Sequence, residues 1–210
     1  MAAKNNTVTS KFYQFRDGKI IRRVATENEN TKVFKPENGK EFLAEVYTNL
    51  VSTLKGLTVT TEEYKEIEYQ VLNVKLFDGT DYEQIQCRFE SNEAASIITR
   101  LSGMSEADIN KELEIGCMKD KNGYNLVFIR QNGATVKSPY SKENPLPAWE
   151  KNEIGKGKNV QVVWDKTDYL LALENLVEQI NAKVKFSKTV PIENPLNGVN
   201  DLENDCPFLD

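Results

Sequence analysis

The chain has 210 residues, with 27 basic and 32 acidic side chains and a formal net charge of -5. This length suits one domain with appendages and allows a substantial buried core. The negative balance excludes a protein that holds polyanions through bulk positive charge, so any nucleic-acid site has to be local.

Cysteine and histidine usage narrows the chemistry further. The chain contains no histidine, and its three cysteines, Cys87, Cys117 and Cys206, form no CxxC pair. A zinc site is therefore not expected, and neither is another metal or cofactor. No apolar run reaches the length of a membrane-spanning helix, and no leader peptide is visible. Together with the odd number of cysteines, these features predict a cytoplasmic protein without membrane association.

The first third of the chain is expected to consist mainly of strands. Residues 1–10 are small and polar, typical of a flexible start. FYQFRDGKIIRRV predicts two strands joined at Asp17-Gly18, because this dipeptide tolerates the positive φ of a tight hairpin turn. Residues 26–39 are expected to form a polar loop, and the charged residues 60–69 a second loop. Between them, FLAEVYTNLVSTLKGLTVT favours strands, although residues 42–50 also fit a short helix.

Two strands with alternating side chains follow, VLNVKLF and YEQIQCRF, joined at Asp78-Gly79. One face is predicted to be core, with Leu72, Val74, Leu76, Ile85, Cys87 and Phe89. The other face is predicted to be wet, with Asn73, Lys75, Phe77, Tyr82, Gln84, Gln86 and Arg88. Because the wet face combines two aromatic rings, amides and two cations, it is a candidate ligand surface.

The middle of the chain then switches to a helix and returns to strands. A helix capped by Ser91 or Asn92 is expected to end at Gly103, with a short polar helix, SEADINKEL, behind it. Residues 113–140 predict three strands with turns at Asn122-Gly123 and Asn132-Gly133. The order of three strands, a helix and two strands predicts a mainly β protein. Its expected core is a five-stranded OB-type Greek-key barrel with an added N-terminal hairpin and a capping helix.

The last third is expected to contain a loop, one more helix and a tail. Residues 138–158 hold three prolines and two glycines and predict an extended loop. A short strand and a C-terminal helix should follow, and the apolar side of that helix should pack on the barrel. This side is formed by Tyr169, Leu170, Leu173, Leu176, Val177 and Ile180. The predicted organisation is a flexible start at 1–10, a folded domain at 11–186 and a disordered acidic tail at 187–210.

The sequence contains no phosphate-binding loop, dinucleotide-binding or nucleophile-elbow motif, and this disfavours an enzyme. Binding of single-stranded nucleic acid is better supported, because aromatic faces stack on bases and cations contact phosphates. Arg22 and Arg23 could extend a phosphate track or simply protect an edge strand. The candidate DNA-binding residues are Tyr64, Lys65, Tyr69, Lys75, Phe77, Tyr82, Arg88, Lys119, Lys121 and Tyr124.

Other interpretations stay open at this level. Phe77 and Tyr82 could simply pair across their hairpin and stabilise it. The same exposed face could belong to a β-barrel adaptor that binds proteins and no nucleic acid. A nuclease that uses carboxylates and Mg²⁺ is a third alternative, since Glu62, Glu63, Glu66 and Glu68 are crowded together.

The segment DLENDCPFLD carries acids around an apolar trio. It resembles the C-terminal tip of bacterial single-stranded DNA-binding proteins, which ends in aspartates, a proline and a phenylalanine. A second similarity, to single-stranded DNA-binding proteins of bacteriophages, lies in the order of several segments. These are FRDGKIIRRV, NGKEFLAEVYTNLVSTLKGLTV, the strand pair 71–89, NLVFIRQNGATVKSPY and VVWD.

The resemblance implies an OB fold that coats single-stranded DNA in replication, recombination or repair within an infected bacterial cell. It also implies a tail that docks on replication or recombination proteins. The residues that would make this contact are Asp201, Glu203, Asp205, Pro207, Phe208, Leu209 and Asp210. Because Leu209 and Asp210 follow the phenylalanine here, a differently shaped partner pocket is expected.

The charge is split unevenly, about -1 for residues 1–185 and -4 for 186–210. This asymmetry motivates a second hypothesis, in which the tail covers the cationic groove until DNA displaces it.

Overall fold

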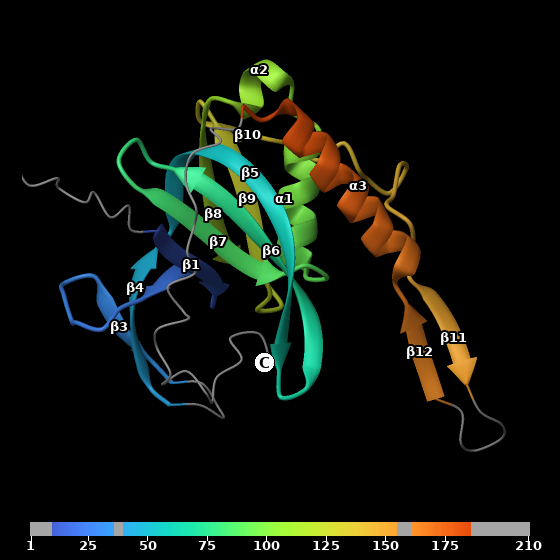
Figure 1. Ribbon diagram of the computed structural model, residues 1–210, viewed down its shortest axis with the longest axis horizontal. Helices are drawn as coiled ribbons and strands as arrows, with labels where there is room; N and C mark the ends of the chain where they lie inside the picture. Colours follow the sequence, from blue (N-terminus) through green and yellow to red (C-terminus); the bar gives the residue numbers. More distant parts are fainter. Residues whose placement is uncertain (1–9, 36–39, 155–160, 186–210) are drawn as a thin grey trace, which may run out of the picture.

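The computed structural model describes residues 10–35, 40–154 and 161–185. Short turns connect most of the elements (Figure 1). The strands are β1 Ser10–Arg16, β2 Lys19–Arg23, β3 Thr31–Phe34, β4 Phe42–Tyr47, β5 Asn49–Tyr64, β6 Ile67–Phe77, β7 Tyr82–Arg88, β8 Glu112–Lys119, β9 Asn125–Gln131, β10 Ala134–Thr135, β11 Glu150–Ile154 and β12 Gln161–Asp165. The helices are α1 Asn92–Ser102, α2 Glu106–Ile109 and α3 Thr167–Lys183.

The protein is mainly β, as the sequence predicts. One ten-stranded mixed sheet has the order β10-β9-β8-β5-β6-β7-β1-β2-β4-β3, and β11 and β12 form a separate two-stranded sheet. Within the large sheet, β5 is long enough to pair with β6 along most of its length and with β8 near its start. The register with β6 shifts between Leu54 and Gly56, just beyond Thr53, the last residue of β5 that pairs with β8.

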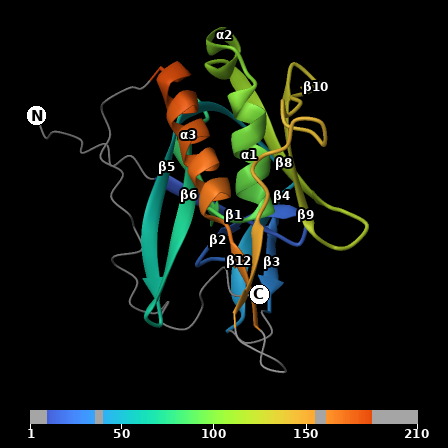
Figure 2. The ribbon, with the colours of Figure 1, turned by 90° about the vertical axis from the view of Figure 1, so that its right-hand side faces the viewer.

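The core lies on the face of β6 and β7 that the alternating pattern identifies. Leu72, Val74, Leu76, Ile85, Cys87 and Phe89 are all buried, which confirms that prediction. Ser91 caps α1 by accepting a hydrogen bond from the Ala94 amide, and Gly103 ends the helix, also as predicted. α3 packs beside α1, and its buried residues include four of the predicted six, Leu173, Leu176, Val177 and Ile180 (Figure 2).

The sheet is not closed into a barrel. The outer edge of β7 is occupied by β1, which pairs with it in parallel from Ser10 opposite Tyr82 to Gln14 opposite Gln86. β7 therefore cannot pair along this edge with β9, the pairing that would complete a five-stranded ring. The predicted N-terminal hairpin is present, with Asp17 and Gly18 at positive φ in its turn, but it is an integral part of the sheet.

Three segments predicted to be loops contain strands. Residues 60–69 continue β5 and β6, which meet in a two-residue turn at Lys65 and Glu66, both at positive φ. This turn geometry matches strand twist even though neither residue is Asn or Gly. The loop 26–39 contains β3, and the loop 138–158 contains β11. The helix alternative for residues 42–50 is wrong, because β4 and β5 cover them apart from Thr48.

Candidate nucleic-acid interface

The face of β6 and β7 predicted to be wet is dry at its centre. Asn73, Gln84 and Gln86 are only 3%, 7% and 6% exposed. The Oδ1 atom of Asn73 accepts hydrogen bonds from both glutamine Nε2 atoms, at 2.7 Å from Gln84 and 2.8 Å from Gln86. The alternating pattern correctly assigns these three residues to the face opposite the core. It cannot show that their side-chain amides hydrogen-bond to one another and are thereby buried. They divide the face into two separate patches.

The first patch lies at the hairpin that joins β6 to β7. The rings of Phe77 and Tyr82 are 5.0 Å apart between centroids and tilted by 46°, and the ammonium group of Lys55 lies 5.5 Å from the Phe77 centroid. Phe77, Tyr82 and the nearby Lys75 are partly exposed. The two rings therefore pair across the hairpin, which is the alternative to a ligand-binding role considered from the sequence. Part of each ring is still exposed to a ligand.

The second patch is a groove at the opposite end of the same strands. Along β7, the seven residues from Tyr82 to Arg88 span about 20 Å. It consists of two adjoining hollows of about 380 and 560 Å³, which share Arg88 and Glu90. In the smaller hollow, the guanidinium carbon of Arg88 lies 5.5 Å from the ring centroid of Tyr69. A cation held over an aromatic ring in this way can contact a phosphate while the ring edge remains beside the ligand.

The larger hollow brings together side chains from distant parts of the chain. Phe15 and Arg16 come from β1, Tyr124 from the turn before β9, and Lys166 from the residue before α3. Tyr124 is 67% exposed, so its ring is available for stacking. The groove thus contains three of the predicted residues, Tyr69, Arg88 and Tyr124, together with three that the sequence did not identify.

The walls of the larger hollow are fixed by docking of the β1–β2 turn against β8 and β9. The Gly18 amide donates a 2.7 Å hydrogen bond to the Oδ1 atom of Asn125, whose Nδ2 donates to Glu93 on α1 at 2.9 Å. The ammonium group of Lys119 lies 2.8 Å from a carboxylate oxygen of Asp17. These contacts join the β1–β2 turn to β8, β9 and α1. Lys119, a predicted DNA contact, is thus engaged in holding the groove together.

The groove is not basic overall. Four carboxylates line it, from Asp17, Glu68, Glu90 and Glu93, beside the cations of Arg16, Arg88 and Lys166. Glu90 forms an ion pair with Lys166 at 2.7 Å, and Asp17 and Glu93 have the partners described above. Because carboxylates repel phosphates, bulk attraction cannot hold a nucleic acid here. Binding would depend on stacking and on a few localised phosphate contacts.

Lys166 connects the groove to a further aromatic surface. Its ammonium group lies 4.4 Å from the ring centroid of Trp149, and that ring makes an edge contact with Tyr169 on α3 at 5.9 Å. Trp149 is 42% exposed. No pattern in the sequence indicated this cluster, because Trp149 precedes β11 by one residue and belongs to a segment predicted to be a loop.

The other predicted contacts lie outside the groove. Tyr64 and Lys65 form the tip of the long β5–β6 hairpin, where the Lys65 ammonium group lies 5.1 Å from the Tyr64 centroid. Lys121 is exposed at the β8–β9 turn. The seven tail residues, Asp201, Glu203, Asp205, Pro207, Phe208, Leu209 and Asp210, lie outside the described residues.

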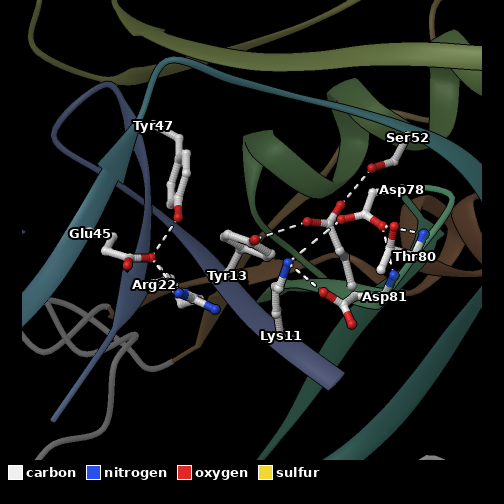
Figure 3. Close-up of polar contacts among 10 residues, drawn as sticks. Lys11, Tyr13, Arg22, Glu45, Tyr47, Ser52, Asp78, Thr80 and Asp81 are labelled. Atoms are coloured by element: carbon white, nitrogen blue, oxygen red, sulfur yellow. Dashed lines mark hydrogen bonds and ion pairs between the residues drawn. The ribbon is translucent and has the colours of Figure 1, made fainter. Parts of the chain in front are cut away.

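A polar network anchors the N-terminal hairpin to the rest of the sheet (Figure 3). The hydroxyl groups of Tyr13 and Ser52 donate to the buried carboxylate of Glu83 at 2.9 and 2.5 Å. On the neighbouring strands, Glu45 accepts hydrogen bonds from Arg22 at 2.8 Å and from Tyr47 at 2.5 Å. Arg22 is thus used in an internal ion pair, which favours a structural role over the phosphate track considered from the sequence.

The pKa shifts in this network follow from burial and hydrogen bonding. Burial raises the pKa of Tyr13 well above its ordinary range, and the adjacent Glu83 carboxylate adds to this effect. For Glu45, burial alone would raise the pKa, but hydrogen bonds from Tyr47 and Asn28 and the contact with Arg22 outweigh it. The pKa of Glu45 is therefore lowered, and its ionised form contributes to the stability of the hairpin.

The described residues contain no group of three or more carboxylates or cysteines that could hold a metal ion. In this part of the chain, no helix is long and apolar enough to cross a membrane. Comparison with known proteins finds no matching family model and no significant match among curated proteins or solved structures.

Proposed function

We propose that the protein is a nonenzymatic single-stranded DNA-binding protein built on an OB-type core. The strand order β9-β8-β5-β6-β7, with α1 between β7 and β8, supports the OB-type assignment. It is the order of a five-stranded OB fold opened between its third and fifth strands. On this assignment, β1 takes the edge that would otherwise close the ring.

The convergence of Tyr69, Arg88, Phe15, Arg16, Tyr124 and Lys166 on one groove carries the proposal. Aromatic side chains and cations line it together, and this combination suits unpaired bases and their phosphates. It lies beside the β8–β9 turn, one of the two loops that flank the ligand in OB folds. Stacking is insensitive to base identity, so sequence preference should be weak.

The titratable groups give little support to catalysis by the described residues. Burial raises the pKa of the Cys117 thiol to about 12 and that of Cys87 further, so a nucleophilic thiolate is disfavoured. The carboxyl groups with resolved shifts, such as Glu45 and Asp78, have lowered pKa values. General acid-base catalysis needs groups whose pKa is moved toward neutrality. A binding role is the better fit.

By resemblance to phage single-stranded DNA-binding proteins, the protein would coat DNA during replication or recombination in the host cytoplasm. Its acidic segment, residues 187–210, would recruit partner proteins. The negative charge and the Pro207-Phe208 pair of that segment support this part of the proposal.

The direct test is a fluorescence titration with an unstructured thymidine oligomer at two salt concentrations, using Trp149 as a reporter beside the groove. Phosphate contacts by Arg16, Arg88 and Lys166 predict that log K falls with log salt with a slope of about -2. A flat titration would favour the protein-binding adaptor instead. Cleavage of the oligomer in the presence of Mg²⁺ would favour the nuclease.

A further inference from the structure

The hairpin of β11 and β12, here called the arm, lies outside the large sheet. It forms its own two-stranded sheet and projects away from the ten-stranded sheet (Figure 1). Its register pairs Glu150 with Asp165 at one end and Ile154 with Gln161 at the other. An isolated two-stranded hairpin is marginally stable in water. The arm therefore needs additional strands or a covering surface to be stable.

The apolar surface of the arm is concentrated on β12. Val162, Val163 and Trp164 are 47%, 45% and 52% exposed, and they occupy successive positions, so apolar side chains face both sides of the hairpin. The paired strand β11 carries Glu150, Lys151 and Glu153, the kind of charges that protect an edge from pairing. Residues 161–164 contain no charge. The edge of β12 is thus the one suited to receive another strand.

We propose that the arm is a self-association element, in which β12 pairs antiparallel with β12 of a second copy of this chain. A two-fold axis at Val163 would place Val162 opposite Trp164 of the second copy and Val163 opposite its counterpart. Asp165 would then lie opposite the neutral Gln161, so no like charges face each other across the new ladder. The same strand serves both copies, as a two-fold interface requires.

Charge also favours a second copy as the occupant. The whole chain carries -5, but residues 150–165 have no net charge in the sequence. Glu150, Glu153 and Asp165 are balanced by Lys151 together with Lys156 and Lys158, two lysines that lie outside the described residues. Two arms can therefore approach without the repulsion that opposes contact between the acidic bodies. Pairing of two short strands would bury less surface than a standard protein interface does. We therefore expect a weak dimer that dissociates on dilution.

The test is sedimentation equilibrium of the full chain over a concentration series, which should show a monomer–dimer equilibrium. Val163→Asp and Val163→Lys should each give a monomer, because each places two like charges on the axis. Mixed in equal amounts, the two variants should form a heterodimer, because opposite charges then meet. Circular dichroism of each variant establishes that it is folded.

Val33→Asp is the matched control, since Val33 is 62% exposed on β3, at an open edge of the large sheet. It should dimerise like the parent chain. A parent chain that stays monomeric at about 0.5 mM would overturn the proposal, because even weak specific dimers assemble there. Loss of the dimer in Val33→Asp would move the interface to β3. Failure of the two folded Val163 variants to associate would overturn the two-fold register.

Discussion

Some side chains of the groove also make contacts that stabilise the fold, and others do not. Only a side chain without such contacts can be replaced to test binding alone. Tyr124 is the best candidate because its ring is two-thirds exposed and its backbone is held independently by the Asp120 carboxylate. Arg88 and Lys119 are less suitable, because one is held over Tyr69 and the other is paired with Asp17. A change at Tyr124 should alter binding without altering the fold.

Replacing Tyr124 by alanine removes one stacking surface, worth about 1 to 3 kcal/mol per base. The dissociation constant for a thymidine oligomer should rise by about 5- to 150-fold, measured by fluorescence anisotropy. Tyr124→Phe is the matched control, because it keeps the ring and loses only the hydroxyl group. If Phe weakens binding as much as Ala does, the hydroxyl group makes the contact and the stacking role is wrong.

The negative charge of Glu90 should weaken the binding of phosphates in the groove. Its carboxylate pairs with Lys166 and faces both hollows, so Glu90→Gln removes a repulsive charge and releases a cation toward the ligand. Binding at low salt should tighten by about 2- to 5-fold, as expected for a partly exposed pair. Glu106→Gln makes the same change of charge on α2, which follows the far end of α1 from the groove. Equal effects of the two substitutions would show that only net charge matters.

The docking of the β1–β2 turn against β8 and the start of β9 forms the larger hollow. A Cβ atom at Gly18 would lie 2.4 Å from the Lys119 backbone nitrogen, whereas a Cβ atom at Gly79 would meet nothing within 4 Å. The φ angles are +71° at Gly18 and +98° at Gly79, so backbone strain alone would make alanine less favourable at Gly79. The steric contact predicts the reverse order.

Gly18→Ala should therefore lower the free energy of unfolding by about 1 to 3 kcal/mol more than Gly79→Ala does, measured by urea denaturation. It should also weaken DNA binding, because the wall formed by Asp17 and Tyr124 shifts. Equal destabilisation by the two substitutions would mean that the β1–β2 turn is not tightly docked.

The network around Glu45 gives the hairpin a dependence on pH. The pKa of Glu45 is lower in the folded chain than its ordinary value, so its contribution to stability is complete above the ordinary pKa and is lost as pH falls through the folded pKa. The free energy of unfolding should decrease in the acid range, and less steeply in Glu45→Gln. Glu112→Gln, at an exposed position on β8, is the control and should leave the slope unchanged. If the free energy of unfolding of Glu45→Gln depends on pH as steeply as that of the parent chain, Glu45 is not the source of the pH dependence.

Elements with a strong local signal were predicted well from the sequence, and elements fixed by distant partners were not. The Asp17-Gly18 and Asp78-Gly79 turns, the core alternation of β6 and β7, and the Ser91 cap all depend on neighbouring residues. The strand content of residues 60–69 was missed, because a turn of Lys65 and Glu66 has no Asn or Gly to mark it. The parallel pairing of β1 with β7 joins segments about 70 residues apart and leaves no local pattern.

The residues of the candidate site differ in the same way in how far the sequence marks them. Strand alternation marks Arg88 and turn position marks Tyr124. Tyr69 is a candidate only as part of segment 60–69, which the sequence predicts to be a loop and which forms strand in the structure. Arg16, Lys166 and Trp149 enter the site only through the docking of hairpins and the start of α3, which no spacing in the sequence encodes. Conversely, Asn73, Gln84 and Gln86 had the composition of a ligand surface, yet their mutual hydrogen bonds bury them.

The net charge of the chain is concentrated in its last residues. Residues 187–210 carry -4 of the net -5, and the groove itself contains more carboxylates than cations. An acidic segment competing for the few cations of the groove would raise the dissociation constant for DNA, and salt would weaken both contacts. Deletion of residues 187–210 should therefore tighten binding of a thymidine oligomer at low salt, with a smaller gain at high salt. A full-length variant with its five tail acids changed to amides should behave like the deletion, because charge and not chain length is responsible. Unchanged affinity in both variants at low salt would exclude competition between the tail and DNA.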